Sequence, residues 1–303
     1  MMARAIVLLA LGLGAPAQAH PIDDLQQGDA LVQSIGWRLA HANAGICTRA
    51  APAVGLLLGD ARTFNDPAAA RDFYGLSGDI SVAAVAQDSP AARAGVDAND
   101  TVVAVAGRPV SAAPLPRPGA WDRVLALQGA LEQAAARDGH VALTLGNGRT
   151  VEIAGEPACT VRFMLDDDKG YARATRAEVR IGRHYYEKTR GTPDAFAAIV
   201  AHEMAHAVLD HQSSVEASHR GLGVVRATEE EADRLSVWLL AKAGYDPEGA
   251  VRLMDTVLRR GQFLTVDAAH GGWKTRARMI QAEIAAMRAA PDLDWSRHFR
   301  RSL

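Results

Sequence analysis

The residues His202, Glu203 and His206 form an H-E-x-x-H pattern, the part of this sequence best suited to chemistry. On a helix, residues four apart lie on one face, so both imidazoles can reach a single metal ion. Imidazole at this spacing suits Zn²⁺, and the neighbouring carboxylate can accept a proton from a water that the ion acidifies. Because such a short pattern also arises by chance, the assignment depends on the rest of the chain.

A catalytic zinc needs a third protein ligand, and an acidic run further along the chain, Thr228 to Asp233, offers one. Glu229 on a following helix would complete a His₂Glu set and leave the fourth position for water. Asp233, one turn later, could accept the free N–H of a ligand histidine and fix its tautomer. A second interpretation needs no metal, because Thr228 and Glu231 fit a capping box. The two are compatible, and we expect Glu231 to cap the helix.

The H-E-x-x-H segment must be helical to present its ligands, and the local sequence predicts a helix. Thr192 suits the N-cap, Pro193 the first helical position, and Asp194 the positive end of the helix dipole. An apolar stripe suited to burial is formed by Phe196, Ile199, Val200 and Leu209.

H-E-x-x-H followed by E-x-x-A-D resembles the signature of the HtpX-like and CAAX-prenyl-protease-like zinc metallopeptidases, a gluzincin group that includes periplasmic BepA-like proteins. The resemblance runs from about residue 172 to residue 303. It implies one Zn²⁺ per chain, a general base and acid, and a carboxylate that orients a ligand. In that order, the implied residues are the ligands His202, His206 and Glu229, then Glu203, then Asp233.

The same family carries H-P-x-x-x-x-R before its final helix, and His270 and Arg276 keep this spacing with Gly271 in place of proline. The resemblance implies that His270 donates a hydrogen bond to the oxyanion of the tetrahedral intermediate. The alternative is a polar loop residue without a catalytic role. We expect Arg276 to make a structural ion pair rather than to contact substrate.

Residues 171–181 alternate in polarity and predict β structure just before the metal helix. In zinc peptidases a strand in this position commonly forms the edge along which substrate lies. A substrate could therefore pair with the segment Ala172, Arg173, Ala174 and Thr175 by strand addition. The acids at 166–168 favour an exposed turn over a second metal site.

A second motif lies in the block 52–155. Residues 88–96 read D-S-P-A-A-R-A-G-V and are followed by D-T-V-V-A-V-A-G at 100–107. This resembles the bacterial PDZ pattern, although Asn99 replaces the usual glycine before Asp100. The block also holds strand-like segments at 54–58, 80–85, 101–105 and 141–145 and a helical segment at 121–136.

The PDZ resemblance implies a small mixed α/β domain that binds extended peptides by adding a strand to a sheet edge. If this is retained, the loop Tyr74, Gly75 and Leu76 is the candidate cradle for a terminal carboxylate. The alternative, held equally open, is that the domain only positions or shields the catalytic domain.

Residues 1–19 have the features of a signal peptide. Arg4 supplies a positive charge, residues 6–13 form a short apolar core, and A-Q-A at 17–19 is a small-x-small cleavage site. An uncleaved anchor is the alternative. We expect an exported protein, periplasmic or secreted, with no membrane span in the mature chain. Residues 20–50 predict an amphipathic helix that docks on the catalytic domain.

Cys47 and Cys159 are the only cysteines and bracket the PDZ-like block. In an exported protein such a pair predicts a disulfide, with two buried free thiols as the alternative. Closing a loop of this length stabilises the fold by about 4–5 kcal/mol in the chain-entropy description.

The chain has 303 residues, 49% hydrophobic and 22% charged, with a formal net charge of -2. This is typical of a globular protein and gives no reason to expect nucleic acid as a partner. We expect an α+β fold: a mostly helical zincin-type metalloprotease domain over 157–303 with a short edge-stranded sheet, and a PDZ-like domain inserted near the N-terminus.

The expected function is an exported zinc metalloendopeptidase whose partners are polypeptide substrates, such as envelope or misfolded proteins. Two rivals stay open: a zinc-bound assembly or quality-control factor with little proteolysis, and a PDZ-type peptide-binding module with a structural zinc. A fourth protein ligand would favour the first rival. His211 is five residues beyond His206 and on a continuous helix faces about 140° away, whereas His219 stays open.

Overall fold

The computed structural model describes residues 21–303 apart from 167–170, 190, 220 and 259–271. The expected signal peptide at 1–19 and His270 therefore lie outside the described residues. In the described part of the chain, every helix is too short or too polar to cross a bilayer.

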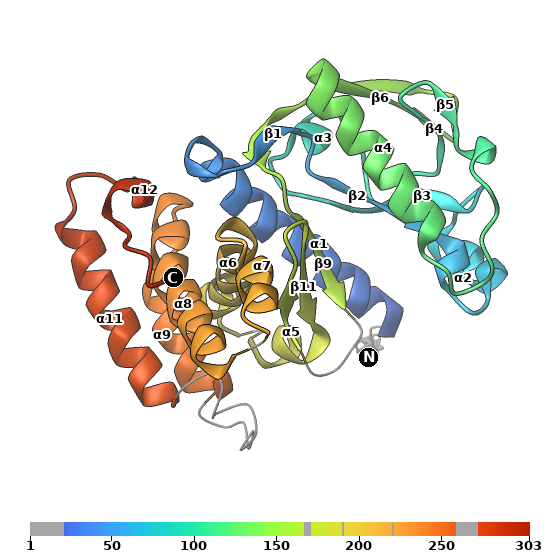
Figure 1. Ribbon diagram of the computed structural model, residues 1–303. Helices are drawn as coiled ribbons and strands as arrows, with labels where there is room; N and C mark the ends of the chain where they lie inside the picture. Colours follow the sequence, from blue (N-terminus) through green and yellow to red (C-terminus); the bar gives the residue numbers. More distant parts are fainter. Residues whose placement is uncertain (1–20, 167–170, 190, 220, 259–271) are drawn as a thin grey trace, which may run out of the picture.

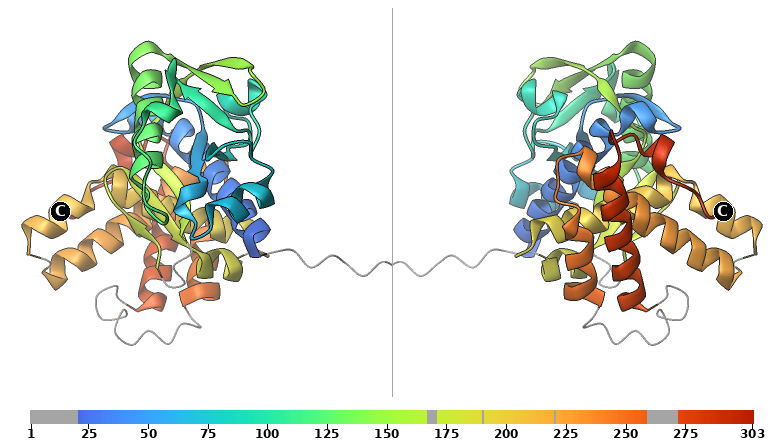
Figure 2. Two further views of the ribbon diagram at one scale, coloured as in Figure 1. Left: turned by 90° about the vertical axis from the view of Figure 1, so that its right-hand side faces the viewer. Right: turned by 90° about the vertical axis from the view of Figure 1, so that its left-hand side faces the viewer.

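The described chain has two hydrophobic cores. Figures 1 and 2 show the two parts of the chain that contain them, with one part above the other in the side views. One core belongs to a mixed segment of strands and helices between residues 54 and 153, and the other to the remaining, mostly helical part. This mixed architecture is compatible with the α+β expectation.

The helical part is centred on α6 (Pro193–Val208), which is buried on nearly every side. Neighbouring helices approach α6 closely because many of its buried side chains are small, namely the alanines at 195, 197, 198, 201, 205 and 207. Gly249 shows how close: a Cβ there would lie 2.4 Å from the carbonyl oxygen of Asp194. Its main packing partners are α8 (Leu222–Lys242) and α9 (Glu248–Leu253), and α11 (Trp273–Ala289) packs on both of these helices.

A three-stranded sheet lies beside α6, in the order β10 (Arg173–Ala174), β11 (Glu178–Gly182) and β9 (Arg162–Asp166). β11 pairs parallel with β9 and antiparallel with β10. The predicted substrate edge at 172–175 thus contains a real edge strand, which is two residues long. Helix α5 (Arg183–Thr189) joins the sheet to α6.

The second core is built from two small sheets and a helix. β2 (Leu56–Asp60) pairs with β3 (Ile80–Val85), and a four-stranded sheet has the order β5-β4-β6-β7. The remaining elements are α2 (Pro67–Tyr74), α3 (Pro90–Arg93), β4 (Val102–Val105), β5 (Arg108–Pro109), α4 (Asp122–Asp138), β6 (His140–Leu145) and β7 (Thr150–Ala154). Helix α4 covers this core with Val124, Leu127 and Leu131.

A short stem connects the two parts. β1 (Ala50–Ala53) pairs antiparallel with β8 (Glu156–Cys159), so the chain leaves and re-enters the helical part at one place. The predicted disulfide between Cys47 and Cys159 is confirmed and closes this stem, with Cα atoms 5.8 Å apart. Helix α1 (Pro21–Ala42) packs on β9 and α6 and also on β3, so it contacts both parts rather than the helical part alone.

Candidate metal centre

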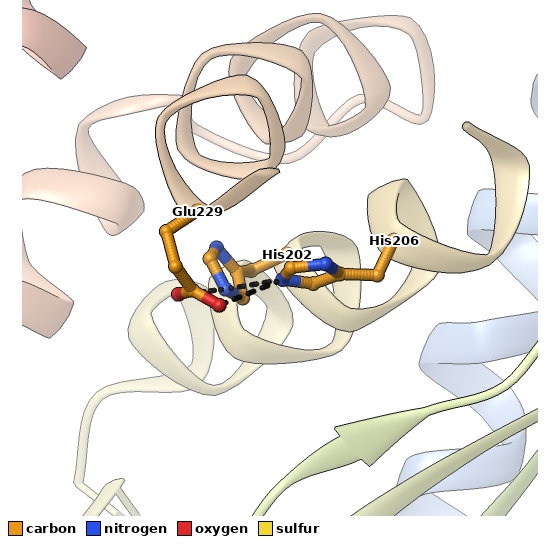
Figure 3. Close-up of side chains that lie close together, drawn as sticks. All are labelled: His202, His206 and Glu229. Atoms are coloured by element: carbon orange, nitrogen blue, oxygen red, sulfur yellow. Dashed lines mark hydrogen bonds and ion pairs between the residues drawn. The ribbon is translucent and has the colours of Figure 1, made fainter. Parts of the chain in front are cut away.

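Three predicted ligands converge between α6 and α8 (Figure 3). The Nε2 atoms of His202 and His206 are 3.2 Å apart, and the carboxylate oxygens of Glu229 lie 3.5 Å and 3.4 Å from them respectively. Zinc bonds of 2.0–2.1 Å in a tetrahedron place ligand atoms about 3.3–3.4 Å apart. The donor set therefore fits Zn²⁺, and among the described residues it is the only group of three or more such side chains gathered this way.

The carboxylate of Asp233 lies beside the imidazole of His202. Its Oδ1 lies 3.0 Å from the Nδ1 of His202, and both of its oxygens accept hydrogen bonds of 2.6 and 2.7 Å from Arg276. The Nδ1 is close to Asp233 but not well aligned, since it lacks a hydrogen bond of good geometry. A small rotation of the imidazole ring would align the two atoms, which are already 3.0 Å apart. Arg276 also lies 3.8 Å from Glu229.

Burial and neighbouring charge shift the pKa values of His202 and His206 in opposite directions. Burial lowers the pKa of His202, but the carboxylates of Asp233 and Glu229 outweigh it and raise this pKa to about 10. Burial dominates at His206 and lowers its pKa to about 3. In the metal-free centre one imidazole is therefore a cation held by two carboxylates, and the other is neutral. A bound cation would take the place of that proton.

Glu203 lines the cleft into which the ligands point. The cleft has a volume of about 680 Å³ and is bordered by residues 171–175 of the predicted substrate edge. Its apolar wall includes Ile199, Leu253 and Met254. One cavity thus contains the predicted base Glu203, the candidate ligands and the edge strand β10.

Tyr185 also lines this cleft, and no motif in the sequence pointed to it. It lies on α5, between the edge strand and the metal helix. Burial raises the pKa of its phenol, and the negative charges of Glu203 and Glu229 raise it further. Only the tertiary arrangement brings this residue to the site.

His211 is not turned away from the centre, contrary to the sequence argument. Helix α6 ends at Val208, and Asp210 adopts a left-handed conformation with φ 55°, so the spacing rule for a continuous helix fails. The Nδ1 of His211 lies 2.9 Å from the Nδ1 of His206. His219 is exposed and is not part of the cleft.

The expected capping box is wrong. Helix α8 begins at Leu222, so Thr228 lies inside it and donates its hydroxyl to the carbonyl of Val225 at 2.7 Å. Glu231 is fully buried and binds His211 and residues 301–303 instead of a helix start. The local sequence suggested a cap because acids and threonine favour helix starts, but the apolar residues before Thr228 extend the helix.

The loop Tyr74-Gly75-Leu76 is poorly suited to hold a carboxylate. Gly75 ends α2 with φ 66°, and its N–H bonds to the carbonyl of Asp72. The N–H of Leu76 bonds to the carbonyl of Arg71 at 2.9 Å. Because both donors close the helix end, they are not available to a peptide carboxylate, although Tyr74 and Leu76 line a cavity of about 380 Å³.

The edge of β2 faces α4 across a cavity of about 280 Å³ that Phe163 of the helical part also lines. A side chain already pairs with this edge. The amide of Gln128 accepts a hydrogen bond from the N–H of Leu58 at 2.9 Å and donates to the carbonyl of Leu56 at 3.4 Å. Gln128 thus occupies the backbone N–H and carbonyl groups with which an added peptide strand would pair.

A PDZ domain family profile matches residues 81–117, which contain β3, α3, β4 and β5. No curated protein and no solved structure matches the chain. The second core therefore contains a PDZ-like domain, a class of domain that binds peptides, and the metal centre has to be interpreted from its own geometry.

Proposed function

We propose that this protein is a zinc-dependent metalloendopeptidase of the HtpX-like and BepA-like kind. The observation that carries the proposal is the tetrahedral spacing of His202, His206 and Glu229 in a cleft that Glu203 and an edge strand also line. A purely structural zinc would need neither the open cleft nor the extra carboxylate.

The three ligands would hold one Zn²⁺, which polarises the scissile carbonyl and lowers the pKa of a water molecule. Glu203 accepts the proton of the attacking water and returns it to the leaving amine. Asp233 keeps His202 oriented, and no covalent intermediate with the protein is needed. Tyr185 lines the same cleft, where its hydroxyl can donate a hydrogen bond to the developing oxyanion, the role that the family resemblance gives to His270.

Substrate binding would use the edge strand. An extended polypeptide can pair with Arg173 and Ala174 of β10, and this orients the scissile bond along the cleft. The apolar wall at Ile199, Leu253 and Met254 favours substrates with a hydrophobic side chain next to the scissile bond. Unfolded or misassembled envelope proteins expose such segments. The disulfide supports an exported location, which remains part of the proposal.

A binding function is the second candidate, and the PDZ match favours it. In that case the PDZ-like domain would recruit polypeptides and the protein would cleave rarely. The arrangement of Gln128 weighs against an open groove, because an incoming strand has to displace it first.

The test is zinc content by mass spectrometry together with casein hydrolysis, for the wild type, Glu203→Gln and the matched control Glu216→Gln. Glu216 lines the same cleft but lies away from the ligands in sequence. We expect one zinc in each protein, hydrolysis in wild type and control, and a loss of at least about 10²-fold in Glu203→Gln. Zinc without hydrolysis in any of them would support the binding function, and wild type without zinc would refute the metal centre.

A further inference from the structure

A second histidine, His211, packs against His206 and is almost fully buried. His211 is 1% exposed, and its ring packs on that of His206 with centroids 4.9 Å apart and planes at 79°. The two Nδ1 atoms are 2.9 Å apart. When the Nε2 of His206 is used to bind the metal, its Nδ1 carries the hydrogen and can donate it to the Nδ1 of His211.

Glu231 fixes the tautomer of His211 in turn. The Nε2 of His211 lies 3.1 Å from a carboxylate oxygen of Glu231, so this nitrogen is the donor and Nδ1 is left as the acceptor for His206. Glu231 is 0% exposed. A buried carboxylate is costly unless its oxygens have partners, and one imidazole N–H is not enough.

Residues 301–303 supply the remaining partners. The backbone N–H groups of Ser302 and Leu303 bond to Oε1 of Glu231, the latter at 3.0 Å. The guanidinium of Arg301 lies 3.1 Å from Oε2 and donates to the carbonyl of Leu209 just after α6. A segment 70 to 72 residues from Glu231 in sequence thus completes the surroundings of this acid.

We propose that residues 301–303, Glu231 and His211 form one positioning relay that sets the tautomer and the ring orientation of the metal ligand His206. Docking of residues 301–303 holds Glu231 in place, Glu231 holds His211, and His211 leaves the lone pair of His206 Nε2 directed at the metal. When residues 301–303 detach, His211 loses its fixed tautomer and His206 is free to rotate. This couples a distant segment to metal affinity.

The relay is separate from the support of the other histidine. His202 is supported by Asp233 and Arg276, whereas His206 is supported by His211. The inference rests on the metal centre that the proposed function uses, but not on peptide hydrolysis, so it is tested by metal affinity.

The decisive comparison is Ser302→Pro against Ser302→Ala in the full chain. Proline removes the N–H that bonds to Glu231, whereas alanine keeps it. Zinc dissociation constants from chelator competition should rise by about 10- to 100-fold for Ser302→Pro and for His211→Ala, and should stay unchanged for Ser302→Ala. The visible spectrum of the cobalt-substituted protein should change with the same variants. If Ser302→Pro does not fold, the milder variant Arg301→Ala tests the same segment.

A double variant separates a relay from general destabilisation. If the segment acts through His211, Arg301→Ala combined with His211→Ala should weaken zinc binding no more than His211→Ala alone. Additive losses, or an unchanged zinc affinity in His211→Ala, would overturn the proposal. Zinc binding without casein hydrolysis in the wild type would refute the peptidase proposal and leave this result standing, so the two proposals can fail separately.

Discussion

Asp233 joins the two cations of the metal centre, because it faces the imidazole of His202 on one side and the guanidinium of Arg276 on the other. It is 1% exposed, so each of these contacts acts where water cannot replace it. The neighbouring charges of Arg276 and His202 hold the pKa of this carboxyl below its usual value, although burial acts in the opposite direction. The acid therefore stays ionised beside the imidazole of His202.

The change Asp233→Asn should weaken the metal centre without removing a ligand. Arg276 would lose its ionic partner and move toward Glu229, which is 3.8 Å away and is needed by the metal. We expect zinc affinity to fall by about 10- to 100-fold and the free energy of unfolding of the metal-free protein to fall by about 3 kcal/mol. Chelator competition and chemical denaturation measure the two effects. An unchanged zinc affinity would show that Asp233 does not orient His202.

At the scale of elements, α6 and α4 show how sequence composition sets what a helix can do. The alanine-rich surface of α6 lets α8 approach until Glu229 reaches the two histidines, and the break at Asp210 returns the chain to the same site. Helix α4 instead presents Gln128 to the edge of β2, where its amide imitates the backbone of a neighbouring strand. The PDZ-like domain therefore caps its own edge.

Replacement of Gln128 by alanine should open this edge. The N–H of Leu58 and the carbonyl of Leu56 would become available, and we expect a library of peptides with free carboxyl termini to bind about tenfold more tightly than to wild type. The exposed Gln133 on the same helix provides the matched control, Gln133→Ala. Fluorescence polarisation measures the affinity. Equal or weaker binding to Gln128→Ala would favour a domain that only positions or shields the metal cleft.

At the scale of the whole molecule, α1 unites the two parts by packing on both. Close approach is visible at Gly36, where a Cβ would lie 2.1 Å from the ring of Phe163 on β9. Asp29 on the same helix accepts a hydrogen bond from the N–H of Leu165 at 2.9 Å. Burial at this contact raises the pKa of Asp29 to about 6, although the hydrogen bond from Leu165 acts in the opposite direction.

This raised pKa predicts how stability depends on pH. A carboxyl whose pKa is higher in the folded state than its ordinary 3.8 favours folding when protonated, and this contribution is lost as pH rises from about 4 to 6. Asp29→Asn should therefore stabilise the protein at pH 7–8, and the gain should vanish below pH 4. Because Asp29 is only partly buried by accessible surface, we expect about 1–2 kcal/mol. Urea unfolding across this pH range measures it, and equal stability of both proteins at pH 7.5 would contradict the prediction.

Local patterns in the sequence predict much of this protein. The spacing of His202 and His206 predicts that the two imidazoles face one site, the acidic run contains Glu229, which gathers with them, and the motif at 88–96 predicts the PDZ-like domain. The disulfide followed from two cysteines bracketing one block. Each of these rests on helical or strand periodicity or on a short motif, which the order of residues specifies directly.

Only the tertiary structure determines which residues contact His206, Glu231 and the edge of β2. A helix break at Asp210 brings His211 back to His206, burial turns Glu231 from a cap into the partner of residues 301–303, and Gln128 closes the edge of β2. These contacts join residues that are distant in sequence or that follow an irregular backbone. Local periodicity carries no information on them, since only the packing of helices and sheets determines which buried polar groups meet.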